Sequence, residues 1–281
     1  MKSFIATLAA ALAVVLGVAA GGAGANGSPY SPGLVYGWDG VRAPGGEVRF
    51  VTFATPRSTV VAAIRVRSGR VLRSTVLRGF YGVPLVAYDG SSGGLSGDRR
   101  TLVLASYGPL PGKAGTTRFA VLDTKTFRKR RIVELSGSWS FDAISPDGSN
   151  LYVVEHVSAP PNPRYRVRIF DLAAGRLFAG AVVDRLENEE VMSGEPVTRA
   201  MSPDGRWAYT LYARQKGRPF VHALDTARRE AFCIDLPLRL RQPRQMELRL
   251  RLAGDGRALY VRRFGVSLTQ IDTRSFEVRQ G

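Results

Sequence analysis

Arginine alternates with leucine twice in the C-terminal part of the chain. The sequence Leu-Arg-Leu-Arg occupies residues 238–241 and recurs at 248–251. In an extended strand, alternate side chains point to the same face, so each run gathers guanidinium groups on one face and leucines on the other. Guanidinium groups bind carboxylates and phosphates through paired hydrogen bonds. The runs therefore predict either an anion-binding face or a charged strand face that opposes aggregation.

Histidine and cysteine, which serve most metal and acid–base sites, are scarce. The chain contains two histidines, His156 and His222, and one cysteine, Cys233. One cysteine excludes an intrachain disulfide and a cysteine-based metal cluster. The sequence has no Asp-x-Asp-x-Asp-Gly calcium loop. We therefore expect no metal and no cofactor. We interpret the one acidic cluster as a solvated loop. It comprises Glu187, Glu189, Glu190 and Glu195.

Three aspartates that stand directly before glycine, in a Ser-Pro-Asp-Gly or Gly-Asp-Gly context, invite a metal-binding interpretation. In a tight turn, however, such an aspartate usually accepts hydrogen bonds from its own turn, and glycine tolerates the positive φ that the turn needs. We interpret these pairs as structural turns. They are Asp147 and Gly148, Asp204 and Gly205, and Asp255 and Gly256.

These turns belong to an internal repeat. The turn aspartates, with Asp98 as a degenerate first member, are spaced by 49, 57 and 51 residues. A second marker, a short apolar run that ends in Asp-Thr or Asp-Leu, follows each turn, with spacings of 48, 54 and 47 residues. Two markers in one phase indicate a repeated structural unit. The aspartates of the second marker are Asp123, Asp171, Asp225 and Asp272.

Each unit has the composition of β-structure. Aromatic and β-branched residues follow each turn, and residues 34–40 resemble 85–90 closely enough to suggest a fainter unit at the N-terminal end. Four short strands per unit at this period predict an all-β fold, a β-propeller of four-stranded antiparallel blades. About five repeats are visible, and six or more are possible if the N-terminal part has diverged. We expect Tyr152 and Tyr260 to be buried in middle strands.

The charge balance is strongly basic. Lysine and arginine number 40 against 23 acidic residues, which gives a formal net charge of +17. Only five of the 40 are lysines, a bias that a GC-rich genome also produces, so the charge alone is weak evidence for a polyanionic partner. Aromatic residues interleaved with the charge are too few for a nucleic-acid groove, and we expect no nucleic-acid partner.

The N-terminus has the pattern of a secretory signal peptide. Lys2 is followed by an apolar stretch at 4–20 and by Ala23-Gly24-Ala25, a small-x-small cleavage pattern. Residues 1–25 are the predicted leader, 26–33 a linker, and 34–281 a single propeller domain. An uncleaved membrane anchor is the alternative. We expect a secreted or extracytoplasmic protein, periplasmic or associated with the cell wall, with no transmembrane segment after cleavage.

The repeat also resembles a known family. A Ser-Pro-Asp-Gly turn, an aliphatic-Tyr-Val strand and a strand ending in Asp-Thr resemble the repeats of bacterial extracytoplasmic propellers of the TolB-like and YVTN-like (WD40-like) type, over residues 84–279 and more weakly over 34–80. The resemblance implies that the strand before each turn lines an axial channel. Arg199, Arg249 and Arg251 would then converge at one channel mouth, as a site for an anionic ligand.

The resemblance leaves two functions open, because such propellers include scaffolds, binding modules and a few enzymes. The leading prediction is a non-enzymatic binding or scaffold protein that contacts a protein or an anionic cell-envelope polymer through its loops and channel mouth. The alternative is a channel-sited enzyme of the lactonase or lyase kind. The predicted channel strands carry more arginine than carboxylate, which favours binding, and no catalytic residue is assigned.

Overall fold

The computed structural model describes residues 31–43, 45–158, 163–184 and 191–280. The predicted leader and most of the predicted linker lie outside these residues, as do Glu187, Glu189 and Glu190. Nearly all regular elements in the described part are β-strands, and consecutive strands pair antiparallel. The predicted all-β class of four-stranded antiparallel blades is confirmed.

Apart from the two-stranded pair of β1 and β6, the described strands form five sheets, which we number as blades in chain order. The first blade comprises β2 (Gly37–Arg42), β3 (Val48–Ala54), β4 (Ser58–Arg65) and β5 (Val71–Arg78). The third comprises β10 (Trp139–Ile144), β11 (Asn150–Ser158), β12 (Arg164–Asp171) and β13 (Arg176–Leu177), with β14 (Met192–Ser193) added beside β12. The fourth comprises β15 (Glu195–Met201), β16 (Trp207–Ala213), β17 (Phe220–Asp225) and β18 (Glu230–Asp235).

The last blade follows a single helical turn, α2 (Gln242–Gln245). Its strands are β19 (Leu248–Leu252), β20 (Ala258–Arg263), β21 (Val266–Asp272) and β22 (Val278–Gln280). No helix within the described ranges is long and apolar enough to span a membrane.

The second blade departs from the four-stranded pattern. It has three regular strands, β7 (Thr101–Ala105), β8 (Thr116–Asp123) and β9 (Lys129–Ser136). An irregular segment lies beside β7, joined to it by the isolated bridges Gly82–Ala105 and Leu95–Leu102. Upstream in this segment, β6 (Val83–Pro84) pairs with β1 (Leu34–Val35). Position 94 of the irregular segment requires glycine, because a Cβ on Gly94 would lie 2.3 Å from the carbonyl oxygen of Val103 on β7.

The turns of the repeat are closed by their own aspartates. The Asp147 carboxylate accepts hydrogen bonds from the Ser145 hydroxyl and the Ser149 backbone N–H. Asp204 accepts from Ser202 and Arg206 in the same way, and Asp255 accepts from the Arg257 backbone N–H. The glycine that follows each aspartate has φ between 71° and 74°. These are local turn interactions, and the sequence alternation that follows each turn forms the second strand of a blade.

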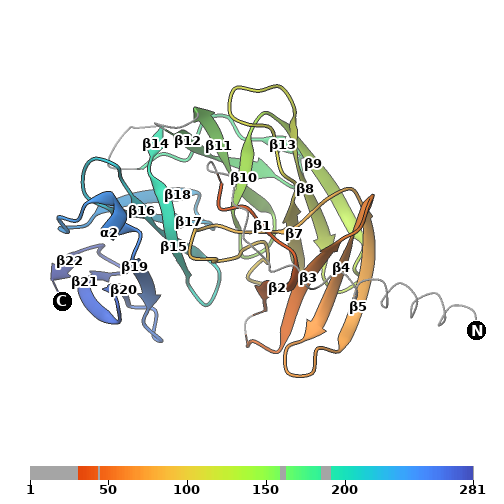
Figure 1. The fold of residues 1–281 in the computed structure, drawn as a ribbon, viewed down its shortest axis with the longest axis horizontal. Helices are drawn as coiled ribbons and strands as arrows, with labels where there is room; N and C mark the ends of the chain where they lie inside the picture. The colour runs from red at the N-terminus through yellow and green to blue at the C-terminus, as the bar shows by residue number, and fades with distance from the viewer. Residues whose placement is uncertain (1–30, 44, 159–162, 185–190, 281) are drawn as a thin grey trace, which may run out of the picture.

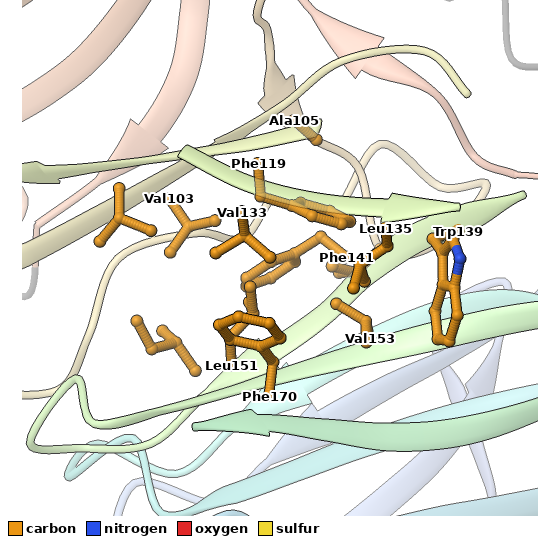
Figure 2. Close-up of a cluster of buried hydrophobic side chains, with 13 residues drawn as sticks. Val103, Ala105, Phe119, Val133, Leu135, Trp139, Phe141, Leu151, Val153 and Phe170 are labelled. Atoms are coloured by element: carbon orange, nitrogen blue, oxygen red, sulfur yellow. The ribbon is translucent and has the colours of Figure 1, made fainter. Parts of the chain in front are cut away.

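The blades follow one another along an arc, with the first blade in orange and the last in blue at its two ends (Figure 1). Apolar clusters fill each of the four successive interfaces. Figure 2 shows the cluster between the second and third blades, where Phe119 and Val133 face Phe141, Leu151 and Phe170. None of the described strands lies between the first and last blades on the open side of the arc.

The tyrosines of the middle strands differ in burial from blade to blade. Tyr152 on β11 is fully buried and Tyr209 on β16 is 2% exposed, and both stand five residues after a turn aspartate. Tyr260 occupies the same place on β20 but is only half-buried. The prediction of a buried middle-strand tyrosine therefore holds for Tyr152 and is wrong for Tyr260, because no other described blade packs on that face of β20.

Candidate functional site

The three arginines of the predicted site lie on first strands of their blades. Arg199 is on β15, and Arg249 and Arg251 are on β19. Each of these strands begins the sequential order of its sheet, and β15 and β19 lie in contact with one another. The side chains nevertheless have different surroundings.

Arg199 is buried in an ion pair with Asp142 of the third blade. One guanidinium nitrogen donates to the Asp142 backbone carbonyl at 3.0 Å, and the other donates to the carboxylate. The two side chains are 5% and 4% exposed. Asp142 is the residue at which the β10–β11 register shifts, between Phe141 and Ala143. Such a bulge re-aims a side chain relative to the regular alternation. Asp142 thereby neutralises Arg199 inside the protein.

A cavity of about 190 Å³ adjoins this ion pair. Asp142 and Arg199 contribute to its wall together with the glycine-rich segment of the second blade at 92–97, and Arg42 lies at its edge. The second carboxylate oxygen of Asp142 and the Nε of Arg199 are buried with no hydrogen-bond partner among the described residues. The pair therefore closes one wall of the cavity as a neutral unit and offers no net charge to an anion.

Arg249 and Arg251 are both exposed on the outer face of the last blade. Leucines at alternate positions of β19 point the other way and pack in the cluster shared with the fourth blade. The strand register places Arg262 opposite Arg249, Tyr260 opposite Arg251, and Gln270 opposite both Tyr260 and Arg279. We call this surface the arginine face. It comprises Arg249, Arg251, Arg262 and Arg279, with Tyr260 and Gln270 between them.

The arginine face has little internal compensation. Arg279 pairs with Glu277 at 3.4 Å. Within the described ranges, the other three arginines form no ion pair. Arg249 donates to the carbonyl oxygens of Met246 and Leu248, which fixes its position without neutralising its charge. The arrangement can therefore bind an anion through guanidinium hydrogen bonds.

The third blade contains a serine–histidine contact that the sequence did not predict. The Ser140 hydroxyl on β10 lies 3.0 Å from Nε2 of His156 on β11, and both line two small cavities of about 50 and 40 Å³. Burial lowers the pKa of His156 to about 4, so the ring is neutral at pH 7. In the described part of the chain, no carboxylate is hydrogen-bonded to this histidine. The 16-residue separation follows no motif, so only the hairpin pairing reveals the contact.

No protein-family model matches the chain, and no curated protein matches it. Solved structures with a similar arrangement of sheets include the Swd1 β-propeller domain of Myceliophteria thermophila, which is 12% identical, with 85% of this chain and 69% of that domain covered and a TM-score of 0.48. TolB from Acinetobacter baumannii is 15% identical over 83% of this chain, with a TM-score of 0.38. The periplasmic gluconolactonase PpgL of Pseudomonas aeruginosa is 17% identical over 81% of this chain, with a TM-score of 0.44. The chain spans 56% of TolB and 64% of the gluconolactonase.

The fold assignment follows from the sheets of this structure itself, in which antiparallel blades repeat in chain order around an arc and bury apolar clusters between them. The chain is a β-propeller. Within this propeller, Arg249 and Arg251 lie together on one surface. Arg199 is directed to the third blade and is removed from that surface by its burial with Asp142.

Proposed function

We propose that this propeller is a non-enzymatic binding protein that holds an anionic partner on its arginine face. The observation that carries the proposal is the pair of exposed guanidinium groups of Arg249 and Arg251 on β19, beside the half-buried Arg262 on β20. Among the described residues, none of the three forms an ion pair and no other blade covers them. Every other blade uses the corresponding face for apolar packing against its successor. Repulsion among uncompensated arginines opposes folding, so their presence there favours a role in binding.

The spacing of these groups suits a ligand with several negative charges. Residues two apart on β19 project from the same face about 7 Å apart, and residues opposite one another on β19 and β20 lie closer, at about 5 Å between Cβ atoms. A ligand with repeated carboxylates or phosphates can therefore engage two or three guanidinium groups at once. The leader-like sequence at residues 1–25 supports an extracytoplasmic site of action, where the partner is a protein or an anionic envelope polymer.

Binding of a fluorescent polyanion tests the proposal. We expect inorganic polyphosphate or poly-L-glutamate to bind the wild-type protein at low ionic strength and to dissociate as salt rises, because salt screens exposed charges over about 8 Å at physiological strength. The double variant Arg249→Gln/Arg251→Gln should weaken binding about tenfold, the equivalent of roughly 1.4 kcal/mol.

A matched control separates the site from net charge. Arg67 and Arg70 are exposed at the β4–β5 turn of the first blade, and Arg67→Gln/Arg70→Gln removes the same two charges. We expect this variant to bind within about twofold of the wild type, on the same affinity scale. An equal loss in both double variants would show that the attraction is a property of the total charge and would reject the arginine face as the site.

A second candidate function is hydrolysis of an ester or lactone at Ser140, favoured by its 3.0 Å contact with neutral His156 beside a cavity. A serine hydroxyl next to a neutral imidazole can serve as a nucleophile with its general base. Labelling with a fluorophosphonate probe tests this function. Labelling of the wild type that is lost in Ser140→Ala would support it, and an unlabelled wild-type protein would reject it.

A further inference from the structure

The open side of the arc has two walls, and both are basic. The arginine face of the last blade forms one end. At the other end, the outer face of the first blade carries Arg42 and Arg49, which lie directly opposite each other on β2 and β3. The inner face of the first blade packs on the second blade through Val41 and Phe50, so the arginines necessarily face away from it.

The outer face of the first blade also carries a small apolar cluster. Val51, Ala62 and Ile64 are buried there in a cluster to which no other described blade contributes. Trp38 packs edge-on against Phe53 with ring centroids 5.3 Å apart. The Arg49 guanidinium donates to the Trp38 carbonyl oxygen at 2.9 Å, and Asp39 lies 3.6 Å from it. The end faces therefore differ, but each presents arginine toward the open side.

Like charges at the two ends oppose closure of the ring by contact between the first and last blades. They also oppose stacking of a second copy, since a copy brings a further charge of +17 and the same basic faces. The arginines of β19 lie on the first strand of their sheet, beside β15.

The arginine face corresponds to the face that is covered by the next blade in the third and fourth blades. Tyr152 and Tyr209, at the place equivalent to Tyr260, are each buried in clusters completed by the next blade. On the arginine face, the ring of Tyr260 and the amide of Gln270 lie between the guanidinium groups. They can contact the backbone and the side chains of a bound polypeptide. Carboxylates at alternate positions of an extended segment repeat about every 7 Å, the same interval as Arg249 and Arg251.

We propose that an acidic, extended segment of a partner protein lies on the arginine face and completes the open side of the propeller. The proposal rests on the proposed anion-binding function and names its partner as protein. The segment presents carboxylates at alternate residues, so that one face pairs with Arg249, Arg251 and Arg262 while the other faces the first blade. Its carboxylates compensate the guanidinium groups of the arginine face.

Two synthetic peptides of equal composition test the proposal. One alternates glutamate with threonine over 12 residues, and the other places the six glutamates and the six threonines in separate blocks. We expect the full-length protein to bind the alternating peptide at least about fivefold more tightly than the block peptide. The difference should disappear in Arg249→Gln/Arg251→Gln and persist in Arg67→Gln/Arg70→Gln. Thermal melts monitored by circular dichroism establish that each variant is folded.

The contribution of the first blade is measured separately. Arg42→Gln should weaken binding of the alternating peptide by about twofold or less, because the peptide directs its threonine face toward the first blade and Arg42 acts on it only through screened charge. Equal affinity for the two peptides would overturn the proposal. Binding of inorganic polyphosphate that depends on Arg249 and Arg251, with neither peptide bound, would retain the anion-binding function and reject the protein segment. Self-association of the protein alone in sedimentation velocity would assign the face to a second copy. Failure of every polyanion to bind would reject both proposals.

Discussion

Tyr152 and Tyr260 occupy the same place in their repeats but differ in their surroundings. Tyr152 is fully buried between the third and fourth blades, and its hydroxyl donates to the Thr226 carbonyl oxygen of the fourth blade at 2.9 Å. Tyr260 lies half-buried on the arginine face, opposite Arg251 and Gln270. The repeat therefore determines which strand a residue occupies, and the following blade determines whether the side chain is buried.

Arginines between two blades and arginines on the last blade also differ, in whether a carboxylate neutralises them. Arg199 lies between two blades and is matched there by a buried carboxylate, Asp142. Arg249 and Arg251 lie on the last described blade, where within the described ranges no carboxylate pairs with either. An interior interface must neutralise a guanidinium group, because a buried unpaired charge is strongly unfavourable. A terminal face can leave such groups available to a ligand.

The largest expected effect is the loss of the covered tyrosine. Tyr152→Ala should lower the free energy of unfolding by about 3 to 5 kcal/mol, because it removes a large ring from a packed interface. Tyr260→Ala should lower it by a smaller amount, about 1 to 2 kcal/mol, since the ring is only partly buried. Urea denaturation of the two variants measures the difference. Equal losses would mean that the last blade is covered in solution.

Breaking the buried ion pair should have an effect of similar or slightly smaller size. Asp142→Ala leaves the Arg199 guanidinium buried without its counter-charge, which should cost about 3 to 5 kcal/mol of unfolding free energy. Asp142→Leu combined with Arg199→Met should restore most of that stability, because apolar residues can replace a buried pair at little cost. Urea denaturation again provides the measurement. If the double variant is no more stable than Asp142→Ala, packing rather than charge dominates this interface.

Much of this comparison could be predicted from the sequence. The two phased markers correctly placed four strands in each of the last three blades, and the alternation at 248–251 placed arginine and leucine on opposite faces of β19. The partner of Arg199 could not be predicted, because the β-bulge at Asp142 breaks the alternation that assigns faces. The irregular segment beside β7 was also missed. Its glycines allow close backbone approach, which leaves no pattern of periodicity.

The next expected effect is a pH dependence of the unfolding free energy that arises from the two buried histidines. Burial lowers the pKa of His156 to about 4, against about 6.5 for an exposed histidine, and burial also lowers the pKa of His222. The unfolded chain therefore takes up protons below pH 6.5 that the folded protein does not. Stability should fall as pH drops from 6.5 to 4, by roughly 3 kcal/mol for His156.

Substitution of His156 isolates this contribution. His156→Gln should show a smaller fall in unfolding free energy between pH 7 and pH 4 than the wild type, whatever its stability at pH 7. Urea denaturation at the two pH values provides the measurement. The turn carboxylates Asp147 and Asp204, whose pKa values are lowered by hydrogen bonds, lose stability mainly below pH 4 and change the wild type and the variant equally. An unchanged pH dependence in the variant would contradict the buried neutral state of the histidine.

The smallest expected effect has the opposite sign and concerns the terminal face. Arg251 forms no ion pair among the described residues and lies two residues from Arg249, so its charge is repelled by its neighbours. Arg251→Gln should therefore raise the free energy of unfolding by roughly a few tenths of a kcal/mol at low ionic strength. The gain should vanish in 1 M salt, where charges are screened beyond about 3 Å. Urea denaturation at both salt concentrations tests this, with Arg67→Gln as a control in a less crowded turn.

The two possible outcomes for Arg251→Gln have different meanings. A variant that is more stable but binds polyanion more weakly would show that the arginine face is optimised for binding at a cost in stability. A destabilised variant would show that Arg251 supports the fold.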